Sequence, residues 1–291
     1  MLIKDYKNTF HKELTLIYDE QEIESFFYIV LDKIHQMKRI DLALNSEAVM
    51  DYNHLRRWKN IASDLKEQKP IQYILGETEF YGLRFLVNEN ILIPRPETEE
   101  LVALIINEEA RSNKQKAGFK ILDIGTGSGC IAITLAKNIP TAEVFAIDIS
   151  EKALATAEKN AELNEVKVTF LQKNILETPD LGQQFDIIVS NPPYVRNLEK
   201  AEIKPNVLEY EPHLALFVED TDALLFYRKI GQLAKKTLTT HGQLYFEINQ
   251  YLGKETVQLL KDLGFENVEL NKDVYGNDRM IKCQNADFRK S

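Results

Sequence analysis

The stretch Ile121-Leu122-Asp123-Ile124-Gly125-Thr126-Gly127-Ser128-Gly129 indicates the fold class of this 291-residue chain. It begins as a short apolar strand, continues as a glycine-rich turn and leads into a helix. The glycines allow the backbone to turn tightly and to approach a ligand closely. A strand, a glycine-rich turn and a helix in this order are typical of an α/β sheet with a ligand at the turn.

The sequence around this stretch alternates between strands and helices from Gly118 onward. Such alternation predicts a doubly wound, mostly parallel sheet. The predicted strands are 120–124, 144–148, 167–171, 185–190, 243–248, 267–271 and 280–283. The predicted helices are 129–138, 151–163, 222–239 and 253–263. Between Tyr194 and Asp222 no periodicity is evident, and we expect a long loop that acts as a lid or a substrate-binding element.

Residues 1–70 are predicted to form a small helical domain. A helix of about 18 residues is indicated by apolar residues at helical spacing, namely Ile23, Phe26, Phe27, Val30, Ile34 and Met37. A second helix is expected to begin near Ser46 as its N-cap. Its apolar residues are Val49, Leu55, Trp58, Ile61, Ala62 and Leu65. Leu14, Leu16 and Ile17 suggest a shorter helix before both. Since no catalytic constellation occurs here, we expect this domain to recognise or support a substrate.

Residues 71–92 are expected to link this domain to a catalytic domain at 93–291. Tyr81-Gly82 lies between two apolar runs, which is a β-hairpin signal. After the linker, Pro96 suits the first turn of a helix, and the carboxylates of Glu97 and Glu99 favour the positive end of the helix dipole. Arg95 and Glu97 are candidates either for a role in the site or for capping this helix.

Composition and charge restrict the classes of function. The chain is 44% hydrophobic and 28% charged, as expected for a globular protein. It shows no signal-peptide pattern and no apolar run near the roughly 20 residues of a membrane helix. Cys130 and Cys283 form no framework, which favours a reducing cytoplasm, and the histidines show no metal-ligand spacing. The net charge of −9 disfavours a nucleic acid and suits a neutral or basic protein partner.

The stretch Ser190-Asn191-Pro192-Pro193-Tyr194 ends a predicted buried strand and is the candidate catalytic segment. Proline has no N–H for the ladder and holds the preceding residue extended, so the strand ends stiffly. The side-chain oxygen of Asn191 and the carbonyl of Pro192 are acceptors that suit an NH2 group, and Tyr194 offers a flat face for stacking. Two acceptors can orient the lone pair of a planar NH2 without a general base. The alternative is a plain proline turn.

Asp148 ends the next predicted strand, about 20 residues after the glycines, where a carboxylate can accept both hydroxyls of a ribose. Glycines and Asp148 alone fit a nicotinamide dinucleotide as well as S-adenosylmethionine. Combined with 191–194, they favour a sulfonium methyl group facing a held NH2. Asp123 either fixes the glycine turn or contacts the amino-acid end of the cofactor, and Asn174 is either an adenine contact or a turn residue.

These residues lie within longer motifs through which the chain resembles the PrmC/HemK family, the glutamine methyltransferases of bacterial peptide chain release factors. The resemblance covers nearly the whole length. Its motifs are Gln72-Tyr73-Ile74-Leu75-Gly76, Glu79-Phe80-Tyr81-Gly82-Leu83-Arg84-Phe85, Ile93-Pro94-Arg95-Pro96-Glu97-Thr98-Glu99, the glycine stretch, Asn191-Pro192-Pro193-Tyr194, Tyr210-Glu211-Pro212-His213-Leu214-Ala215-Leu216-Phe217 and Gly276-Asn277-Asp278-Arg279.

The resemblance implies a seven-stranded class I methyltransferase fold that binds S-adenosylmethionine and methylates the glutamine of the Gly-Gly-Gln loop in release factors. Through matching motifs it implies that Gly125, Thr126, Gly127, Ser128 and Gly129 hold the methionine end of the cofactor and that Asp148 holds the ribose. It further implies that Asn191, Pro192, Pro193 and Tyr194 hold the substrate amide, with Asn191 also near the cofactor. The chain departs from the family at Asn174-Ile175, where an aromatic residue is common, and at Val218-Glu219-Asp220-Thr221, where glycines are common.

Three other interpretations remain open at this point. A ribosomal-protein glutamine methyltransferase shares the same motif, and a nucleic-acid adenine methyltransferase also has an NH2 target. A catalytically silent scaffold with the same fold is the third. The acidic charge counts against the adenine methyltransferase, and the intact glycine stretch with Asp148 and Asn191 counts against the scaffold.

Overall fold

The computed structural model describes residues 1–112 and 118–286 and divides the chain into two compact units. The first unit consists of Met1–Gly76 and Lys204–Tyr210, and the second of Glu77–Ile203 and Glu211–Ser291. The expected linker at 71–92 is therefore divided between the units after Gly76. The described helices include none that is long and apolar enough to cross a membrane.

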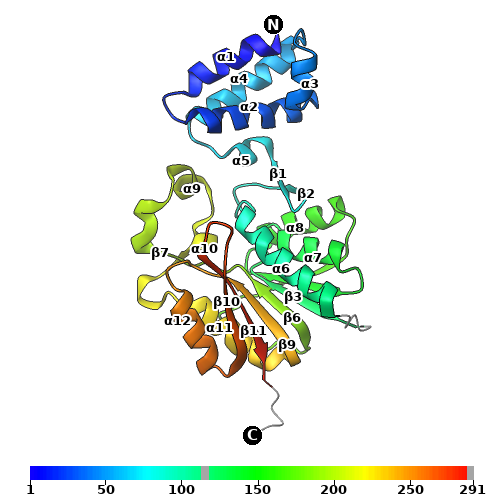
Figure 1. Cartoon of the computed structure of the whole chain (residues 1–291), viewed down its shortest axis with the longest axis vertical. Helices are drawn as coiled ribbons and strands as arrows, with labels where there is room; N and C mark the ends of the chain where they lie inside the picture. Colours follow the sequence, from blue (N-terminus) through cyan, green and yellow to red (C-terminus); the bar gives the residue numbers. More distant parts are fainter. Residues whose placement is uncertain (113–117, 287–291) are drawn as a thin grey trace. The chain divides into compact units, whose positions relative to one another are not determined.

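The first unit is helical (Figure 1). Its helices are α1 (Ile3–Leu14), α2 (Glu20–His35), α3 (Arg39–Leu44), α4 (Tyr52–Lys66), α5 (Ile71–Leu75) and α9 (Pro205–Tyr210). Trp58 and Phe10 are buried at its centre, with ring centroids 5.4 Å apart in an edge-on arrangement. The distant segment that contains α9 joins this unit through the hydroxyl of Tyr210, which donates to the Glu67 carbonyl at 2.7 Å.

Two expectations for this unit are wrong. Helix α4 begins at Tyr52, and its N-cap is Asp51, whose carboxylate accepts a hydrogen bond from the His54 N–H at 2.7 Å. Val49 is 65% exposed, so the apolar run after Ser46 belongs to a loop and not to the helix. Similarly, α1 ends at Leu14, and Leu16 is 98% exposed. The predicted long helix is confirmed as α2. This helix ends at His35, and the next residue, Gln36, has a left-handed backbone conformation (φ 53°).

The second unit contains the predicted seven-stranded sheet, with strand order β10-β11-β9-β6-β3-β4-β5. Its strands are β3 (Lys120–Ile124), β4 (Glu143–Asp148), β5 (Val168–Gln172), β6 (Phe185–Ser190), β9 (Leu238–Glu247), β10 (Phe265–Lys272) and β11 (Asp278–Asn285). Strand β11 runs antiparallel to both neighbours and the other pairs are parallel, which confirms the mostly parallel sheet.

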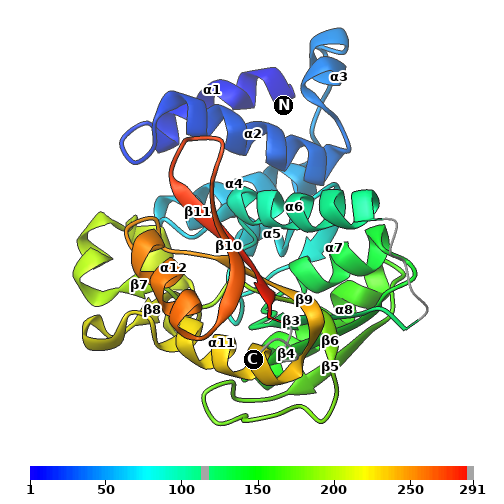
Figure 2. The same cartoon turned by 60° about the horizontal axis from the view of Figure 1, so that its bottom comes forward.

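Helices cover both faces of this sheet (Figures 1 and 2). They are α6 (Pro96–Ser112), α7 (Cys130–Asn138) and α8 (Glu151–Leu163) on one face, and α11 (Leu225–Thr237) and α12 (Gly253–Asp262) on the other. Successive side chains of β3 point to opposite faces of the sheet, because side chains alternate along a strand. Ile121 packs with the first set of helices and Leu122 with the second, so the β3 strand is buried on both sides.

The carboxyl ends of the parallel strands lie in register at one edge of the sheet. Ile124 at the end of β3 pairs with Ile147 on one side and with Ser190 on the other. Ser190 in turn pairs with Phe246, one residue before Glu247. The register therefore brings the segments that follow β3, β4, β6 and β9 together, as expected for an open α/β sheet.

The hairpin predicted around Tyr81-Gly82 is confirmed, with β1 (Glu77–Phe80) and β2 (Leu83–Leu86) antiparallel. Phe80 and Phe85 are buried in the core on the α6–α8 side of the sheet. The segment predicted as a long loop instead contains short elements. These are β7 (Val195–Arg196), η1 (Asn197–Glu202), α10 (His213–Leu216), β8 (Phe217–Val218) and η2 (Asp220–Asp222), together with α9.

Candidate active site

A cavity of about 330 Å³ lies at the carboxyl edge of the sheet, within the second unit. It is lined by residues from the ends of β3, β4 and β6, from the segment after β2, from the segment after β5, from α10 and from α11. The predicted site residues on its wall are Gly125, Gly127, Asp148, Asn174, Ile175, Asn191, Pro192 and Pro193. The structure thus brings together residues that are far apart in the sequence.

The glycine loop, residues 125–129, forms one wall of this cavity. Gly125 and Gly127 have φ angles of 74° and 54°, and open space lies where a Cβ would project. A side chain at either position would therefore be strained and would enter the cavity. Gly129 has a different role, because a Cβ there would come within 2.8 Å of Ile133 Cδ1. Thr126, Ser128 and Gly129 are not on the wall, and all three are buried.

Asp123 lies fully buried beneath the glycine loop. Its Oδ2 accepts a hydrogen bond from the Thr126 hydroxyl at 2.6 Å, which fixes the turn. Its Oδ1 is buried and has no hydrogen-bond partner among the described residues. Burial raises the pKa of Asp123 to about 7, against the lowering effect of the Thr126 hydroxyl. Asp123 thus fixes the turn from beneath, and it is not among the residues that line the cavity.

Asp148 holds the two sides of the cavity through backbone hydrogen bonds. Its Oδ2 accepts from the N–H of Gly127 and its Oδ1 from the N–H of Ser150, both at 2.9 Å. Burial raises the pKa of Asp148, and these backbone donors oppose the rise. Each carboxylate oxygen has two acceptor positions, so both oxygens can still accept from a ligand hydroxyl.

Asn174 and Ile175 line the same cavity after β5. The side chain of Asn174 accepts a hydrogen bond from the Leu176 N–H at 3.0 Å, which is the contact of a turn residue. Phe226 in α11 also lines the cavity, and the sequence reasoning missed it. Its position in a helix that carries other core residues gave no signal of a site.

Residues 191–193 of the segment 191–194 form another part of the cavity wall. Asn191 Nδ2 donates to Thr98 Oγ1 at 3.1 Å. Among the described residues, neither Asn191 Oδ1 nor the Pro192 carbonyl accepts a hydrogen bond. Tyr194 is not among the residues that line the cavity, and its hydroxyl donates to Glu247 Oε1 at 3.0 Å. The segment therefore has two acceptors without a donor in the described part of the chain, Asn191 Oδ1 and the Pro192 carbonyl. The Tyr194 hydroxyl already has a partner in Glu247.

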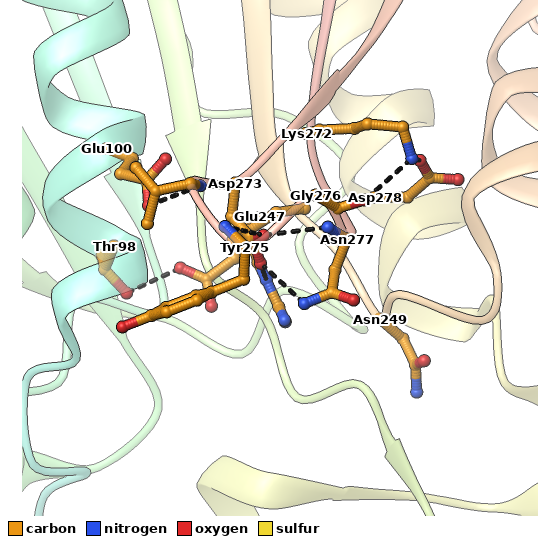
Figure 3. Close-up of polar contacts among 12 residues, drawn as sticks. Thr98, Glu100, Glu247, Asn249, Lys272, Asp273, Tyr275, Gly276, Asn277 and Asp278 are labelled. Atoms are coloured by element: carbon orange, nitrogen blue, oxygen red, sulfur yellow. Dashed lines mark hydrogen bonds and ion pairs between the residues drawn. The ribbon is translucent and has the colours of Figure 1, made fainter.

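Thr98 and Glu247 are site residues that the sequence reasoning missed as such. The Thr98 hydroxyl donates to Glu247 Oε2 at 2.6 Å, a contact drawn in Figure 3. Thr98 follows Pro96 in the first turn of α6, and Glu247 is the last residue of β9. A charged residue at the carboxyl end of a predicted strand was the available signal for Glu247, but the predicted strand 243–248 placed it inside the strand.

Glu211 and Asn160 are further residues that hold the walls. Glu211 Oε2 accepts from the N–H of Ile93 at 3.1 Å, and the same carboxylate forms an ion pair with Arg95. Arg95 and Glu211 are thus paired although they lie 116 residues apart in the sequence. The buried amide of Asn160 in α8 accepts from the Leu86 N–H at 2.6 Å and donates to the Ser128 carbonyl at 2.9 Å, so it ties the hairpin to the glycine loop.

Comparisons with known proteins agree with this geometry. Residues 107–210 match the family model of the methyltransferase small domain. The chain is 67% identical over 282 residues to a release factor glutamine methyltransferase of Flavobacterium psychrophilum, covering 97% of this chain and 99% of that protein. It is 42% identical to the protein of the same name from Bacteroides thetaiotaomicron, covering 91% of this chain and 94% of the other.

Solved structures support the fold. A methyltransferase of Pyrococcus furiosus matches with a TM-score of 0.52 at 18% identity, covering 81% of this chain and all of the other. The T. thermophilus 16S rRNA N2 G1207 methyltransferase, solved with AdoMet and guanosine, matches with a TM-score of 0.50 at 20% identity, covering 72% of this chain and 49% of the other. These likenesses show a class I S-adenosylmethionine-dependent methyltransferase fold. With the two relatives at high coverage, they show that the chain belongs to the family of release factor glutamine methyltransferases.

Proposed function

We propose that this enzyme transfers a methyl group from S-adenosylmethionine to the side-chain amide nitrogen of a glutamine in a peptide chain release factor. The observation that carries the proposal is the pair of open acceptors, Asn191 Oδ1 and the Pro192 carbonyl, at the wall of the cavity that also contains the glycine loop. The glutamine of the Gly-Gly-Gln loop is the target that the family resemblance favours.

The residues of the cavity fit S-adenosylmethionine. Gly125 and Gly127 leave room for its methionine end, and Asp123 supports the glycine loop from beneath through its hydrogen bond with Thr126. Asp148 keeps acceptor positions for ribose hydroxyls, while Asn174 and Ile175 border the space for an adenine. When bound, this cofactor supplies a methyl group on a positively charged sulfur.

The protein's part in the reaction is to orient the substrate nitrogen. A glutamine side-chain nitrogen is a poor nucleophile because its lone pair is conjugated with the carbonyl. Asn191 Oδ1 and the Pro192 carbonyl would each accept one hydrogen of the NH2 group, which returns electron density to nitrogen and fixes its direction. Because these acceptors are held before the substrate arrives, they need little reorganisation during the reaction.

A general base is not required by this arrangement. Among the residues that the structure describes, the ionisable side chains on the cavity wall are those of Glu89, Asp148 and Lys173. The carboxylate of Asp148 is engaged by two backbone N–H groups. Tyr194 stays a proposed substrate contact through the face of its ring, while its hydroxyl serves Glu247. Among residues 1–112 and 118–286, no cluster of three or more acidic, histidine or cysteine side chains could hold a metal ion.

The first unit is proposed to recognise the protein substrate, with residues 1–70 as its main part, 71–92 as the connection and 93–291 as the catalytic part. Its support is a helical core in which the described residues include no catalytic group. Within the same proposal the partner is a protein and not a nucleic acid or a membrane. Cys130 and Cys283 are free and buried, which supports a location in the cytoplasm.

The experiment that tests this proposal uses the full chain and S-adenosylmethionine with a labelled methyl group. Its substrates are an intact release factor, the same factor with its loop glutamine changed to alanine, and duplex DNA. Mass spectrometry then locates the label. We expect one methyl group on the loop glutamine and none in the altered factor. Transfer to DNA adenine, or none to any substrate from a protein that binds the cofactor, would contradict the proposal.

A further inference from the structure

A chain of hydrogen bonds runs from Asn191 into the protein interior. Asn191 Nδ2 donates to Thr98 Oγ1 at 3.1 Å, and the Thr98 hydroxyl donates to Glu247 Oε2 at 2.6 Å. The other oxygen of Glu247 accepts from the Tyr194 hydroxyl at 3.0 Å. Thr98 and Glu247 are only 3% and 1% exposed, so water cannot readily exchange for these partners. These hydrogen bonds link α6, β9 and the segment 191–194, and Figure 3 shows the one between Thr98 and Glu247.

The hydrogens available on each group decide which group donates in each of these hydrogen bonds. An ionised carboxylate only accepts, so the Thr98 hydroxyl must donate its single hydrogen to Glu247. The Thr98 oxygen can then only accept, and the group on Asn191 that faces it must be the NH2 group. The opposite end of the same carboxamide is therefore an oxygen, and among the described residues it accepts no hydrogen bond.

We propose that Thr98 and Glu247 are positioning residues that hold the carboxamide of Asn191 in the one orientation in which its oxygen can accept from the substrate NH2 group. This inference rests on the proposed function. In the reversed orientation an NH2 group of Asn191 would meet the NH2 group of the substrate, which places donor against donor. The Pro192 carbonyl would then be the only acceptor left of the pair.

The charge of Glu247 is what keeps the direction of the chain. If Glu247 gained a proton on Oε2, it would donate to Thr98, and the Thr98 hydrogen would be free to turn toward Asn191. Burial raises the pKa of Glu247, while the hydroxyls of Thr98 and Tyr194 and the charge of Arg279 lower it, and Glu97 raises it. Cys130 and Tyr227 are the other ionisable groups affected by its charge.

Arg279 is itself held in place. Its Nε donates to Asp273 Oδ2 at 3.1 Å, and Asp273 also accepts from the N–H groups of Tyr275 and Asn277 in the turn between β10 and β11 (Figure 3). The side chains of Asp273 and Arg279 are 0% and 14% exposed. The turn thus keeps a cation near Glu247, which favours the ionised carboxylate that the chain of hydrogen bonds requires.

The test compares Thr98→Val with Thr98→Ser, using kcat and KM for an intact release factor and the dissociation constant of S-adenosylmethionine. Valine has the shape of threonine without the hydroxyl, so the carboxamide loses its fixed orientation. We expect kcat to fall about 100-fold with the cofactor affinity within about twofold of wild type, because a misdirected group affects the reacting geometry. Serine keeps the hydroxyl and should restore most of kcat.

Thr256→Val is the matched control. Thr256 is also buried, and its hydroxyl donates to the carbonyl of Leu252, the N-cap residue of α12. We expect this variant to lose thermal stability while kcat stays unchanged. A second variant, Glu247→Gln, removes the charge that sets the direction but keeps the shape. Its kcat should fall about tenfold, since an amide can face Thr98 with either end.

A pH profile separates positioning from a merely structural role. Wild-type kcat should fall on the acidic side as Glu247 gains a proton, at a pH above that of an ordinary glutamate because burial raises this pKa. Glu247→Gln should lack this acidic decline. If Thr98→Val and Glu247→Gln both kept wild-type kcat while the wild type methylated the release factor, the positioning role alone would be overturned. If the wild type methylated no release factor, the proposed function and the positioning role would fall together.

Discussion

The glycine loop and the segment 191–194 both contribute residues to the wall of one cavity, but they are held in different ways. The loop is fixed partly by near neighbours in the sequence, as when Thr126 donates to Asp123, and partly by the adjacent end of β4, where the Ile147 carbonyl accepts from the N–H groups of Gly125 and Thr126. Asn191 is fixed from two elements far away along the chain, because Thr98 lies 93 residues before it and Thr98 in turn contacts Glu247. A binding wall made locally can be recognised in a sequence, whereas an orientation set by distant elements cannot.

The largest effect that sharpens this contrast is expected from Asn191→Ala. Removing the carboxamide takes away one of the two acceptors, and we expect kcat/KM for the release factor to fall about 1000-fold, as for the loss of a preorganised polar group in other active sites. The dissociation constant of S-adenosylmethionine, measured by calorimetry, should change little because the glycine loop is untouched. Loss of cofactor binding in this variant would show that the two walls do not act separately.

Gly127→Val is expected to weaken the binding of S-adenosylmethionine, in contrast to Asn191→Ala. The φ angle of 54° strains any side chain, and the new side chain would enter the cavity. We expect the cofactor dissociation constant to rise about 100-fold, with a stability loss of about 1–2 kcal/mol from the left-handed backbone. Calorimetry and urea unfolding measure the two effects. Gly182→Val is a control for the strain alone, because its φ is 68° and it does not line the cavity.

Asn160→Ala tests whether the local wall also depends on a distant contact. The variant leaves the Leu86 N–H and the Ser128 carbonyl without their partner in the buried space. We expect the free energy of unfolding to fall by about 3 kcal/mol, since buried groups that lose their partner are costly. Urea unfolding checks this value. The control is Gln258→Ala, which removes an exposed amide contact with Asp262 in α12 and should change stability little.

Asp123→Asn tests the buried carboxylate under the glycine loop through the pH dependence of stability. The folded-state pKa is raised from 3.8 to about 7, so Asp123 is protonated more readily in the folded than in the unfolded chain. Its contribution to stability is therefore fully present below the unfolded pKa and is lost as the pH rises to about 7. We expect the variant to gain stability relative to wild type as the pH is raised from 5 to about 8, in thermal unfolding without cofactor. An unchanged difference across this range would contradict the assignment.

The smallest effect is expected from Tyr194→Phe. The variant keeps the ring and removes one donor from buried Glu247, which retains Thr98 as a donor. We expect kcat to fall by a factor of about 3 to 10, consistent with the loss of one hydrogen bond to a charged group. Steady-state kinetics with the release factor measures it, and Tyr227→Phe provides a comparison at a buried tyrosine outside the cavity wall. A loss as large as that of Asn191→Ala would assign the hydroxyl a direct part in the reaction.

The sheet could be predicted because its signals are local and repeated. Buried strands such as Lys120–Ile124 are short apolar runs, and the helices between them have clear periodicity. The N-terminal unit was harder where apolar residues are exposed. Val49 and Leu16 look like core residues in the sequence, yet the helices that they suggested begin or end elsewhere, because Asp51 supplies the N-cap and α1 ends at Leu14.

The site was predicted at the level of its wall residues but not of its supports. Asn191, Asp148 and the glycines stand at strand ends, where an α/β sheet binds ligands, so their position follows from the order of elements. Glu211, which holds Ile93 and Arg95, is 118 residues from Ile93 in the sequence. No spacing rule connects such pairs, and only the folded chain brings them together.

The most direct test of the account is a crystal structure of the enzyme with S-adenosylhomocysteine and a peptide that contains the release factor glutamine. We predict that the glutamine side-chain nitrogen lies roughly 3 Å from both Asn191 Oδ1 and the Pro192 carbonyl oxygen, which is hydrogen-bond distance. Asn191 Nδ2 should still donate to Thr98. A glutamine nitrogen bound by other groups, or an Asn191 carboxamide turned with its NH2 group toward the substrate, would contradict the central claim.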